Sequence, residues 1–379
     1  MKAPRIQASI RKTGVVRFGV VGVGFMGLNH CNGIRSVAGA RLSAVCDGDA
    51  ARAERAAAKF KVASFASHKD LIRSGACDAV CIATPHPLHP GPAVDCMNAG
   101  LHVITEKPLS ECVSTAERMI RAAEKNRVAF AVMFQRRFEP AMLKAVEIAR
   151  SGALGRIRRT LMVAPEYRSQ AYYDSGKWRA TWKGEGGGVM INQAPHVMDL
   201  FILLGGMPCE VYGRTETRMH RIEVEDLAEA MLKYPGGGTG YFHCSTCEPA
   251  PGQMIEIFGD KGKLVFRDGA LKLFRYDPPV DVHNRINREP GTLAAPRLIE
   301  QKIRVEQRET DHAQVIENMT LHLLKGVPLL SAGATGLASL ELANAVTLSS
   351  HLGRPVKIPI SRRMYDRFLA DRRKKASGA

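Results

Sequence analysis

Short apolar runs alternate with amphipathic or alanine-rich stretches through the first third of the chain. Residues 16–21 and 40–47 are apolar and short enough to be buried strands, whereas the alanine-rich residues 50–60 are typical of a helix. This alternation at short spacing predicts a parallel sheet with helices on both faces. The expected strands are 16–21, 40–47, 78–83, 102–105 and 128–133, and the expected helices are 24–37, 50–60, 69–75, 92–99 and 115–126.

The pattern changes after Phe134. Strands now follow one another, with turn signals such as Pro-Gly-Gly-Gly at 235–238 between them. This predicts a second α/β domain with a large, open, mostly antiparallel sheet. The proline-rich residues 278–300 show no period and are expected to form a long loop. Helices are expected at 139–152, 189–204, 311–325 and 335–352, and strands at 155–167, 209–217, 225–235, 238–246, 253–260, 262–269 and 270–277.

Length and composition agree with two domains, because 379 residues with 45% hydrophobic content can bury two sizeable cores. The fold class predicted is α/β, an N-terminal dinucleotide-binding domain followed by the open-sheet domain. We expect a basic flexible lead at 1–14, the nucleotide-binding domain at 15–135, a substrate-binding and oligomerisation domain at 136–360, and a basic tail at 361–379.

The formal net charge of +17 invites a nucleic-acid function, but its distribution argues against one. More than half of the excess lies in the two ends of the chain, which are more often solvated than nucleic-acid arms. No apolar stretch approaches the length of a membrane span, and the N-terminus has no apolar signal region. We therefore expect a cytoplasmic protein that binds neither nucleic acid nor membrane.

Nine cysteines are scattered along the chain, an odd number that favours reduced thiols over a disulfide framework. Cys244 and Cys247 have C-x-x-C spacing, but no second pair of ligands stands at a spacing suited to zinc. We expect structural thiols and no metal.

A glycine-rich turn gives the first candidate chemistry. In VRFGVVGVGFMGLNH, the glycines Gly22, Gly24 and Gly27 follow a strand and open a helix. In a dinucleotide-binding turn they allow the tight bend, the approach of backbone to pyrophosphate and close packing of helix on strand. Asp47 ends the second strand at the distance expected for a carboxylate that holds the ribose hydroxyls. A carboxylate there favours NAD over NADP, although Arg52, otherwise a solvated residue, offers a partner for a phosphate.

Two further stretches, ITEKPLS at 104–110 and GEGGGVMINQAPHVMDL at 184–200, extend the pattern together with CIATPHPLH at 81–89. In this order and spacing they resemble the glucose–fructose oxidoreductase / inositol dehydrogenase / rhizopine catabolism (Gfo/Idh/MocA) family, over about residues 16–360. The resemblance implies a Rossmann domain, a homodimer or homotetramer formed through the C-terminal sheet, and NAD(P)-dependent oxidation of a sugar or polyol. WRATWKGEGGGVMINQ is most similar to the branch acting on pyranoses and glycosides, including enzymes that oxidise C3.

Lys107 and His196 are the expected catalytic pair. A lysine after a parallel strand lies where such sheets bind ligands, and a desolvated amine exchanges protons readily. Imidazole suits removal of a hydroxyl proton near neutral pH. Asn192, four residues before His196, is expected on the same helical face, and it stands where inositol dehydrogenases have an aspartate. Asp199 either orients His196 or forms a structural ion pair, and Lys107 and His196 each have a purely structural alternative.

The remaining candidates follow from the resemblance and from sugar chemistry. Aromatic rings suit apolar sugar faces, and charged groups suit hydroxyls. His86 is the weaker of two histidines in its loop. The predicted cofactor-binding residues are Gly22, Gly24, Phe25, Met26, Gly27, Asp47, Arg52, Thr84, Pro85, His89, Glu106 and Lys107, and the predicted substrate-binding residues are Arg136, Tyr167, Tyr172, Trp178, Arg179, Asn192 and His196.

These residues predict an NAD-dependent dehydrogenase that oxidises a ring hydroxyl, C3 being one option, of a pyranose or glycoside to the keto sugar. Two alternatives stay open. One is an NAD-retaining glycosidase or lyase that works through transient C3 oxidation, and the other is a non-catalytic NAD-bound regulator.

Overall fold

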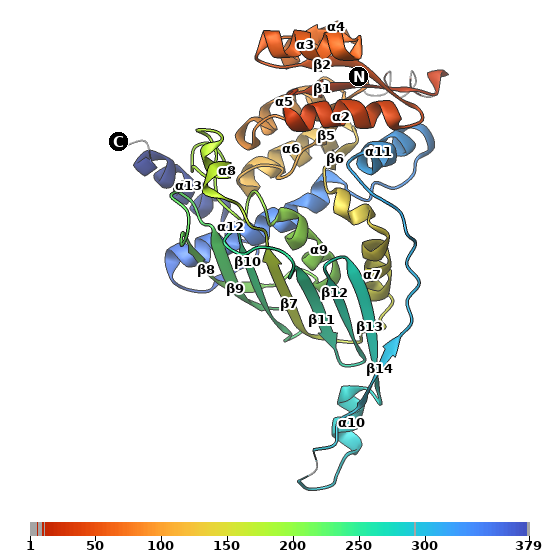
Figure 1. The fold of residues 1–379 in the computed structure, drawn as a ribbon, viewed down its shortest axis with the longest axis vertical. Coiled ribbons are helices and arrows are strands. Elements are labelled where there is room, and N and C mark those ends of the chain that lie inside the picture. Colours follow the sequence, from red (N-terminus) through yellow and green to blue (C-terminus); the bar gives the residue numbers. More distant parts are fainter. Residues whose placement is uncertain (1–5, 7–9, 11, 292, 377–379) are drawn as a thin grey trace. The chain divides into compact units, whose positions relative to one another are not determined.

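The structure is a computed structural model that describes the chain except for residues 1–5, 7–9, 11, 292 and 377–379 (Figure 1). None of the described helices is long and apolar enough to cross a membrane. The chain folds into two compact units, each assembled from three segments. The first unit comprises Met1–Phe138, Gly184–Gly186 and Thr310–Leu340, and the second comprises Glu139–Lys183, Gly187–Glu309 and Glu341–Ala379.

The first unit is built on a six-stranded parallel sheet of order β3-β2-β1-β4-β5-β6. This doubly wound order places the switch point between β1 and β4, where such sheets bind ligands. The parallel sheet predicted from the alternating pattern is confirmed, and the short, largely exposed β3 is an addition to it. The strands are β1 (Val16–Val21), β2 (Ala40–Cys46), β3 (Ala63–Phe65), β4 (Ala79–Ile82), β5 (His102–Thr105) and β6 (Phe130–Val132).

Helices separate these strands at nearly the predicted positions. Side-chain caps fix where two of them begin: Asp49 and Ser67 accept backbone N–H groups at the N-termini of α3, which keeps its predicted bounds, and of α4, which shifts by one residue. The elements are α2 (Phe25–Ser36), α3 (Ala50–Phe60), α4 (His68–Ser74), η1 (His86–Leu88), α5 (Pro90–Asn98), α6 (Val113–Asn126), η2 (Gln135–Phe138), α11 (Ala313–Lys325) and η3 (Gly333–Gly336).

The core of the first unit takes in residues from both ends of its sequence. Phe18 and Val20 of β1 are fully buried, and Ile316 and Met319 of α11 pack into the same cluster. Ile10, in the segment predicted as a flexible lead, is also buried in this core, whereas residues 1–5, 7–9 and 11 of that lead lie outside the described residues. Helix α11 therefore joins this unit because its apolar face completes the core.

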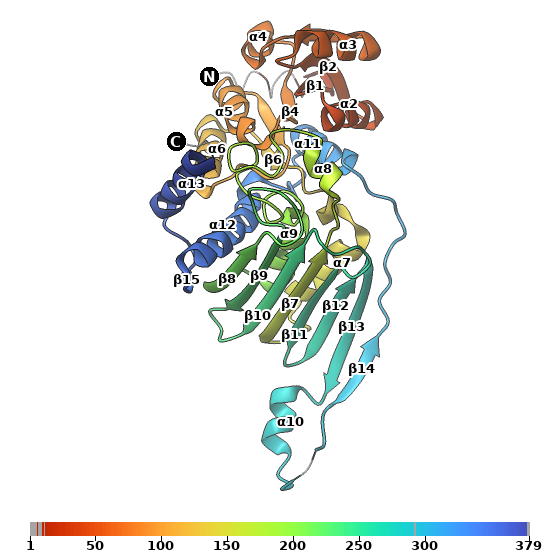
Figure 2. The same cartoon turned by 60° about the vertical axis from the view of Figure 1, so that its left-hand side comes forward.

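The second unit contains a nine-stranded sheet of order β14-β13-β12-β11-β7-β10-β9-β8-β15 (Figure 2). Among the described strand pairs of this second sheet, only β7–β10 is parallel, so the predicted, mostly antiparallel sheet is confirmed. The strands are β7 (Ile157–Pro165), β8 (Glu210–Glu216), β9 (Leu227–Lys233), β10 (Thr239–Ser245), β11 (Met254–Gly259), β12 (Gly262–Arg267), β13 (Ala270–Asp277), β14 (Arg297–Gln301) and β15 (Val356–Lys357).

Helices cover one face of this sheet. A Cβ on Gly205 of α9 would lie 2.9 Å from Thr160 of β7, which shows how closely this helix packs. On β9, Ala228, Ala230 and Leu232 face this buried side, while Met231 between them is exposed. The helices described in the second unit, not all of which cover the sheet, are α7 (Pro140–Arg150), α8 (Gln170–Asp174), α9 (Pro195–Gly205), α10 (Val280–Ile286), α12 (Leu337–Leu352), whose first residues belong to the first unit, and α13 (Arg362–Ala376).

Two segments differ from the sequence predictions. Residues 278–300, expected as a loop, form α10 and β14, because Arg297–Gln301 completes a backbone ladder with β13. The basic end of the chain forms α13, whose Tyr365, Phe368 and Leu369 are buried. The sequence analysis expected a tail because this segment is rich in basic residues, although its apolar residues stand at the spacing of a helix.

Candidate active site

The glycine turn of the first unit has the geometry that a dinucleotide requires. Gly22 has a φ of +89°, and a Cβ there would lie 2.8 Å from the backbone of Ala83. A Cβ on Gly27 would overlap the carbonyl oxygen of Gly22. At Gly24, by contrast, the described residues place no atom within 4 Å of an added Cβ. The turn is therefore tight at Gly22 and Gly27, where backbone packs, and open at the N-terminus of α2, whose N–H groups suit an anion.

Asp47 follows β2 and is 9% exposed. Its Oδ2 accepts a hydrogen bond from the Val23 N–H at 2.9 Å, and its Oδ1 accepts one from the Asp49 N–H at 2.9 Å. The Arg52 guanidinium lies 3.3 Å from Oδ1 and also pairs with Asp49. The carboxylate therefore braces the glycine turn itself. Of the neighbouring predicted residues, Phe25 is 88% exposed and Met26 half-buried.

The loop after β4 is fastened by His89, which is completely buried. Its Nε2 lies 2.7 Å from the carbonyl oxygen of Thr84 and its Nδ1 2.9 Å from that of Pro108. Burial lowers the pKa of His89 below its ordinary value. Nδ1 thus ties this loop to the Glu-Lys-Pro segment, whereas Nε2 contacts the loop's own backbone. The Thr84 hydroxyl oxygen is buried and has no hydrogen-bond partner among the described residues, and Pro85 is exposed.

Glu106 lies at the carboxyl end of β5 and is also buried. Its Oε1 lies 2.7 Å from Nε2 of His30, and its Oε2 accepts the backbone N–H of Lys107 at 3.1 Å. Burial alone would raise the pKa of Glu106, but the hydrogen bond and charge of His30, with the charge of Lys107, lower it to about 2. An ionised carboxylate therefore holds the backbone of Lys107, whose side chain is half-buried.

His30 is a residue that the sequence reasoning missed. The available signal was a histidine three positions after Gly27, on the helix face that meets the sheet.

The first unit fits a bound dinucleotide. An open helix N-terminus, a carboxylate after β2 and the unpartnered Thr84 hydroxyl lie along the carboxyl ends of β1, β2 and β4. These are the groups that pyrophosphate, ribose and the second nucleotide require.

Arg136 and Arg137 occupy η2. Arg137 is buried and donates to the Leu330 carbonyl oxygen at 2.9 Å and to the Thr335 hydroxyl at 2.6 Å. It anchors this part of the first unit, while Arg136, the predicted substrate ligand, is half-buried.

In the second unit, Tyr172 clusters with three other predicted substrate residues, Trp178, Arg179 and Asn192. Arg179 donates to the phenol oxygen of Tyr172 at 2.9 Å and lies over both the Tyr172 and Trp178 rings. Asn192 donates to the same oxygen at 3.3 Å, as does Gln193 at 3.4 Å, a residue not predicted from sequence. Because N–H donors converge on this oxygen, the phenol proton is directed elsewhere. Tyr167, in the same loop, is 47% exposed.

The expected helix over 189–204 begins later, so the prediction that Asn192 and His196 share one helical face is wrong. Helix α9 starts at Pro195, with Asn192 in the turn before it and His196 in its first turn. The chain before the helix is held by Glu225, whose Oε1 accepts the N–H groups of Gly188 at 2.9 Å and Met190 at 3.1 Å. Proline at the first helical position was the signal for the later start. Asp199, in the next turn, is buried.

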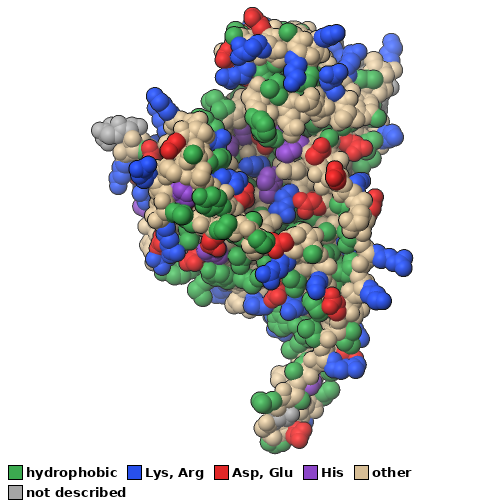
Figure 3. All heavy atoms as spheres, in the orientation of Figure 1, with side chains coloured by type: hydrophobic (Ala, Val, Ile, Leu, Met, Phe, Trp, Pro, Cys, Tyr) green, Lys and Arg blue, Asp and Glu red, His purple; other side chains and the backbone are tan. Residues whose placement is uncertain are grey.

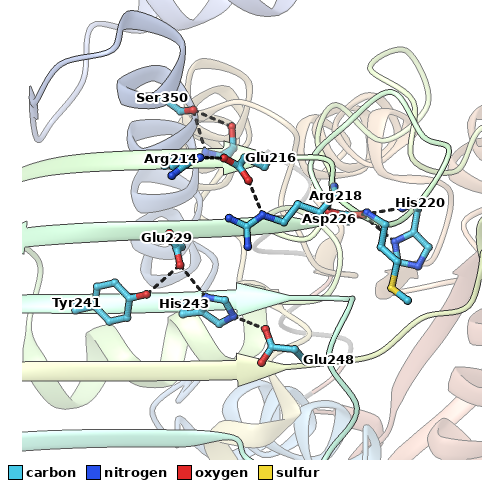
Figure 4. Close-up of polar contacts among 12 residues, drawn as sticks. Arg214, Glu216, Arg218, His220, Asp226, Glu229, Tyr241, His243, Glu248 and Ser350 are labelled. Carbon is cyan, nitrogen blue, oxygen red and sulfur yellow. Dashed lines mark hydrogen bonds and ion pairs between the residues drawn. The ribbon is translucent and has the colours of Figure 1, made fainter.

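The cysteines are all free thiols, and burial raises the pKa of both Cys244 and Cys247. The ligand atoms of His220, Asp226 and Cys247 lie within 4.8 Å of one another. However, Asp226 accepts three backbone N–H groups and contacts Nδ1 of His220 (Figure 4). Nε2 of His220 lies 2.8 Å from the Arg168 carbonyl oxygen. These hydrogen bonds explain why the three side chains lie close together: they hold the loop that follows β8 in place.

Comparisons with known proteins agree with this geometry. Residues 16–134 match the model of the GFO_IDH_MocA oxidoreductase family, NAD-binding Rossmann fold, and residues 142–265 match a GFO/IDH/MocA C-terminal domain. D-apiose dehydrogenase of Paraburkholderia graminis is 26% identical over 92% of each chain. Inositol 2-dehydrogenase of Rubrobacter xylanophilus is 37% identical over 37% of this chain and 41% of its own length.

Among solved structures, the WlbA dehydrogenase of Chromobacterium violaceum in complex with NADH and UDP-GlcNAcA is similar. It is 28% identical, with a TM-score of 0.79, over 92% of this chain and 97% of that one. Levoglucosan dehydrogenase in complex with NADH, at 20% identity and a TM-score of 0.75 over 91% and 100%, shares the fold. The glycine turn, the two sheets and both family models agree, and the chain belongs to the Gfo/Idh/MocA family of NAD-binding oxidoreductases.

Proposed function

We propose that this protein is an NAD-dependent dehydrogenase that oxidises a ring hydroxyl of a pyranose sugar or glycoside to the keto sugar. The observation that carries the proposal is the buried, ionised Glu106 holding Lys107 at the carboxyl end of β5. Ligands of doubly wound sheets bind at this edge. A fixed lysine there is suited to act on a reacting oxygen.

The substrate class is inferred from the Tyr172 cluster. Aromatic rings beside amide and guanidinium donors, with one phenol proton left for a ligand oxygen, suit a polyhydroxylated ring. D-apiose dehydrogenase and the WlbA complex with UDP-GlcNAcA support a sugar substrate. We assign Tyr167, Tyr172, Trp178, Arg179 and Arg136 to substrate binding.

Bound NAD would supply the acceptor for the hydride that leaves the carbinol carbon. Lys107 donates a hydrogen bond to the reacting oxygen, His196 removes the hydroxyl proton, and Asn192 holds a neighbouring hydroxyl. His89 would support the cofactor site by holding the loop after β4 to the Glu-Lys-Pro segment, because its Nδ1 faces the Pro108 carbonyl oxygen and its Nε2 that of Thr84.

The test is a screen of pyranoses, glycosides and inositols with NAD⁺ and NADP⁺, followed by absorbance of the reduced cofactor. On the best substrate, Lys107→Ala and His196→Ala are each expected to lower kcat by roughly 10²- to 10⁴-fold. Lys125→Ala, an exposed lysine in the last turn of α6, serves as the control and is expected to retain wild-type turnover.

The outcomes separate the alternatives. Full turnover by Lys107→Ala would contradict the assigned mechanism. Cleavage of a glycoside without net NADH would favour the redox-neutral glycosidase or lyase, and binding of NAD without any turnover would favour a regulator.

We further propose that the outer face of the second unit's sheet joins copies of this chain. Tyr212, Met231 and Tyr241 are exposed there at 50%, 66% and 39%. These three side chains are direct neighbours across β8, β9 and β10. Charged side chains of both signs lie beside this row, among them Arg214, Glu216 and Arg218 (Figures 3 and 4). An exposed face that mixes aromatic residues with paired charges is suited to a symmetric self-contact.

A further inference from the structure

A buried histidine behind the Glu-Lys-Pro segment has no assigned role. His30 lies on α2, the helix that the glycine turn opens, and is 1% exposed. Its Nε2 lies 2.7 Å from Oε1 of Glu106, which follows β5. Since β4 separates β1 from β5 in the sheet, this one contact ties the phosphate-binding helix to the edge that carries Lys107.

The direction of the hydrogen bond follows from the chemistry of Glu106. Its carboxylate accepts on both oxygens, from His30 at Oε1 and from the Lys107 N–H at Oε2. The ionised form that burial would disfavour is kept by these donors. His30 therefore donates from Nε2, and without that donor the buried carboxylate would lose its principal support.

The surroundings of Nδ1, the second ring nitrogen of His30, indicate that the contact of Nε2 with Glu106 explains why a polar side chain occupies this position. Nδ1 of His30 is buried and makes no hydrogen bond within the described part of the chain. The ring of His312, at the start of α11, meets it edge-on with centroids 5.7 Å apart. An apolar residue would fill this site without an unsatisfied nitrogen. With histidine at this position, the hydrogen bond from Nε2 to Glu106 offsets the free-energy cost of the unsatisfied Nδ1.

We propose that His30 is a positioning residue for Lys107: it holds Glu106 in place, and Glu106 holds the lysine backbone. This inference rests on the proposed function, in which Lys107 acts on the reacting oxygen. His30 itself touches neither cofactor nor substrate in this role.

The test compares two substitutions of His30 in the full chain. His30→Leu removes the donor, and we expect kcat to fall roughly 10- to 100-fold, because small displacements of a catalytic group have effects of this size. The KM for the sugar is expected to change less than about three-fold, since Tyr172 and its neighbours bind the sugar. His30→Gln returns an amide N–H near the position of Nε2 and is expected to restore kcat to within about three-fold of wild type.

Controls separate positioning from folding. His102→Gln removes another buried histidine, at the far end of the same strand β5, and is expected to keep wild-type kcat at pH 8. All rates are taken per NADH-binding site, counted by fluorescence titration, so that unfolded protein does not enter kcat.

The results distinguish two failures. If Lys107→Ala abolishes turnover but His30→Leu keeps wild-type kcat, or if Gln rescues no better than Leu, the role of His30 is wrong while the proposed function stands. If Lys107→Ala keeps turnover, or no sugar is oxidised by the wild type, the proposed function and this inference fall together.

Discussion

Single buried charges organise the residues around the proposed site. Asp47, Glu106 and Glu225 are each buried, and each accepts backbone N–H groups from a segment that carries candidate chemistry. A carboxylate that accepts backbone N–H groups fixes the position of the loop that donates them. The sequence identified Asp47 and Glu106 as polar residues after strands, but their partners became visible only in the folded chain.

Asp47→Asn tests cofactor selection. The carboxylate disfavours a 2′-phosphate, and its removal is expected to raise the ratio of kcat/KM with NADP⁺ to that with NAD⁺ about ten-fold. Turnover with NAD⁺ itself is expected to fall, because an amide cannot accept from both Val23 and Asp49. Asp49→Asn, on the same loop but more exposed, is the control. An unchanged ratio would show that Asp47 does not face the ribose.

His102→Gln tests a pH effect on stability. Burial, followed by the charge of His322, lowers the pKa of His102 to about 4, and its Nδ1 accepts the Ala129 N–H at 2.9 Å. The unfolded chain therefore binds a proton below about pH 6.5 that the folded chain binds only near pH 4, so stability falls as the pH drops through this window. Between pH 6.5 and 4, we expect this group to lower the free energy of unfolding of the wild type by about 3 kcal/mol. The decrease is expected to be correspondingly smaller in the variant, and urea unfolding at the two pH values measures both.

At the scale of elements, local pattern located most helices and strands, and long-range contacts decided the rest. The helix bearing His196 begins at Pro195 rather than Val189, because Gly188 and Met190 give their N–H groups to Glu225. Residues 297–301 form a strand because their backbone pairs with the edge strand β13. The local hydrophobic pattern of these residues does not predict this pairing. Helix α13 was not predicted because its many basic residues indicated a solvated tail.

Gly188→Ala tests the segment before α9. An added Cβ would overlap the carbonyl oxygen of Glu225, so this segment must move. We expect a loss of at least about 2 kcal/mol in the free energy of unfolding, together with reduced kcat, because Asn192 and His196 follow directly. Gly236→Ala, where the described residues leave the space around a Cβ open, is the matched control. Equal unfolding midpoints for the two variants would refute this account.

At the scale of the whole molecule, the two proposed proton-transfer residues belong to different units: Lys107 to the first and His196 to the second. Each unit draws on distant parts of the sequence, as α11 does in completing the core of the first. The outer sheet face of the second unit adds the expectation of self-association.

Met231→Asp tests that association. A carboxylate at the centre of the outer face is expected to shift the molar mass measured by light scattering toward the monomer, through desolvation and repulsion from Glu229. Met364→Asp, an exposed methionine on α13, is the control and should keep the wild-type mass. A wild-type monomer at micromolar concentration, or an unaffected Met231→Asp variant, would exclude this interface.

The sequence by itself determined the parallel sheet, the glycine turn and the positions of the candidate motifs, because hydrophobic period, glycine spacing and strand ends are local properties of the chain. Only the tertiary structure decided which groups support them. His30 meets Glu106 across 76 positions of sequence, and Gly188 meets Glu225 across 37. The chain topology and the need to satisfy buried polar groups determine such pairs, and neither can be inferred from the hydrophobic periodicity of the sequence.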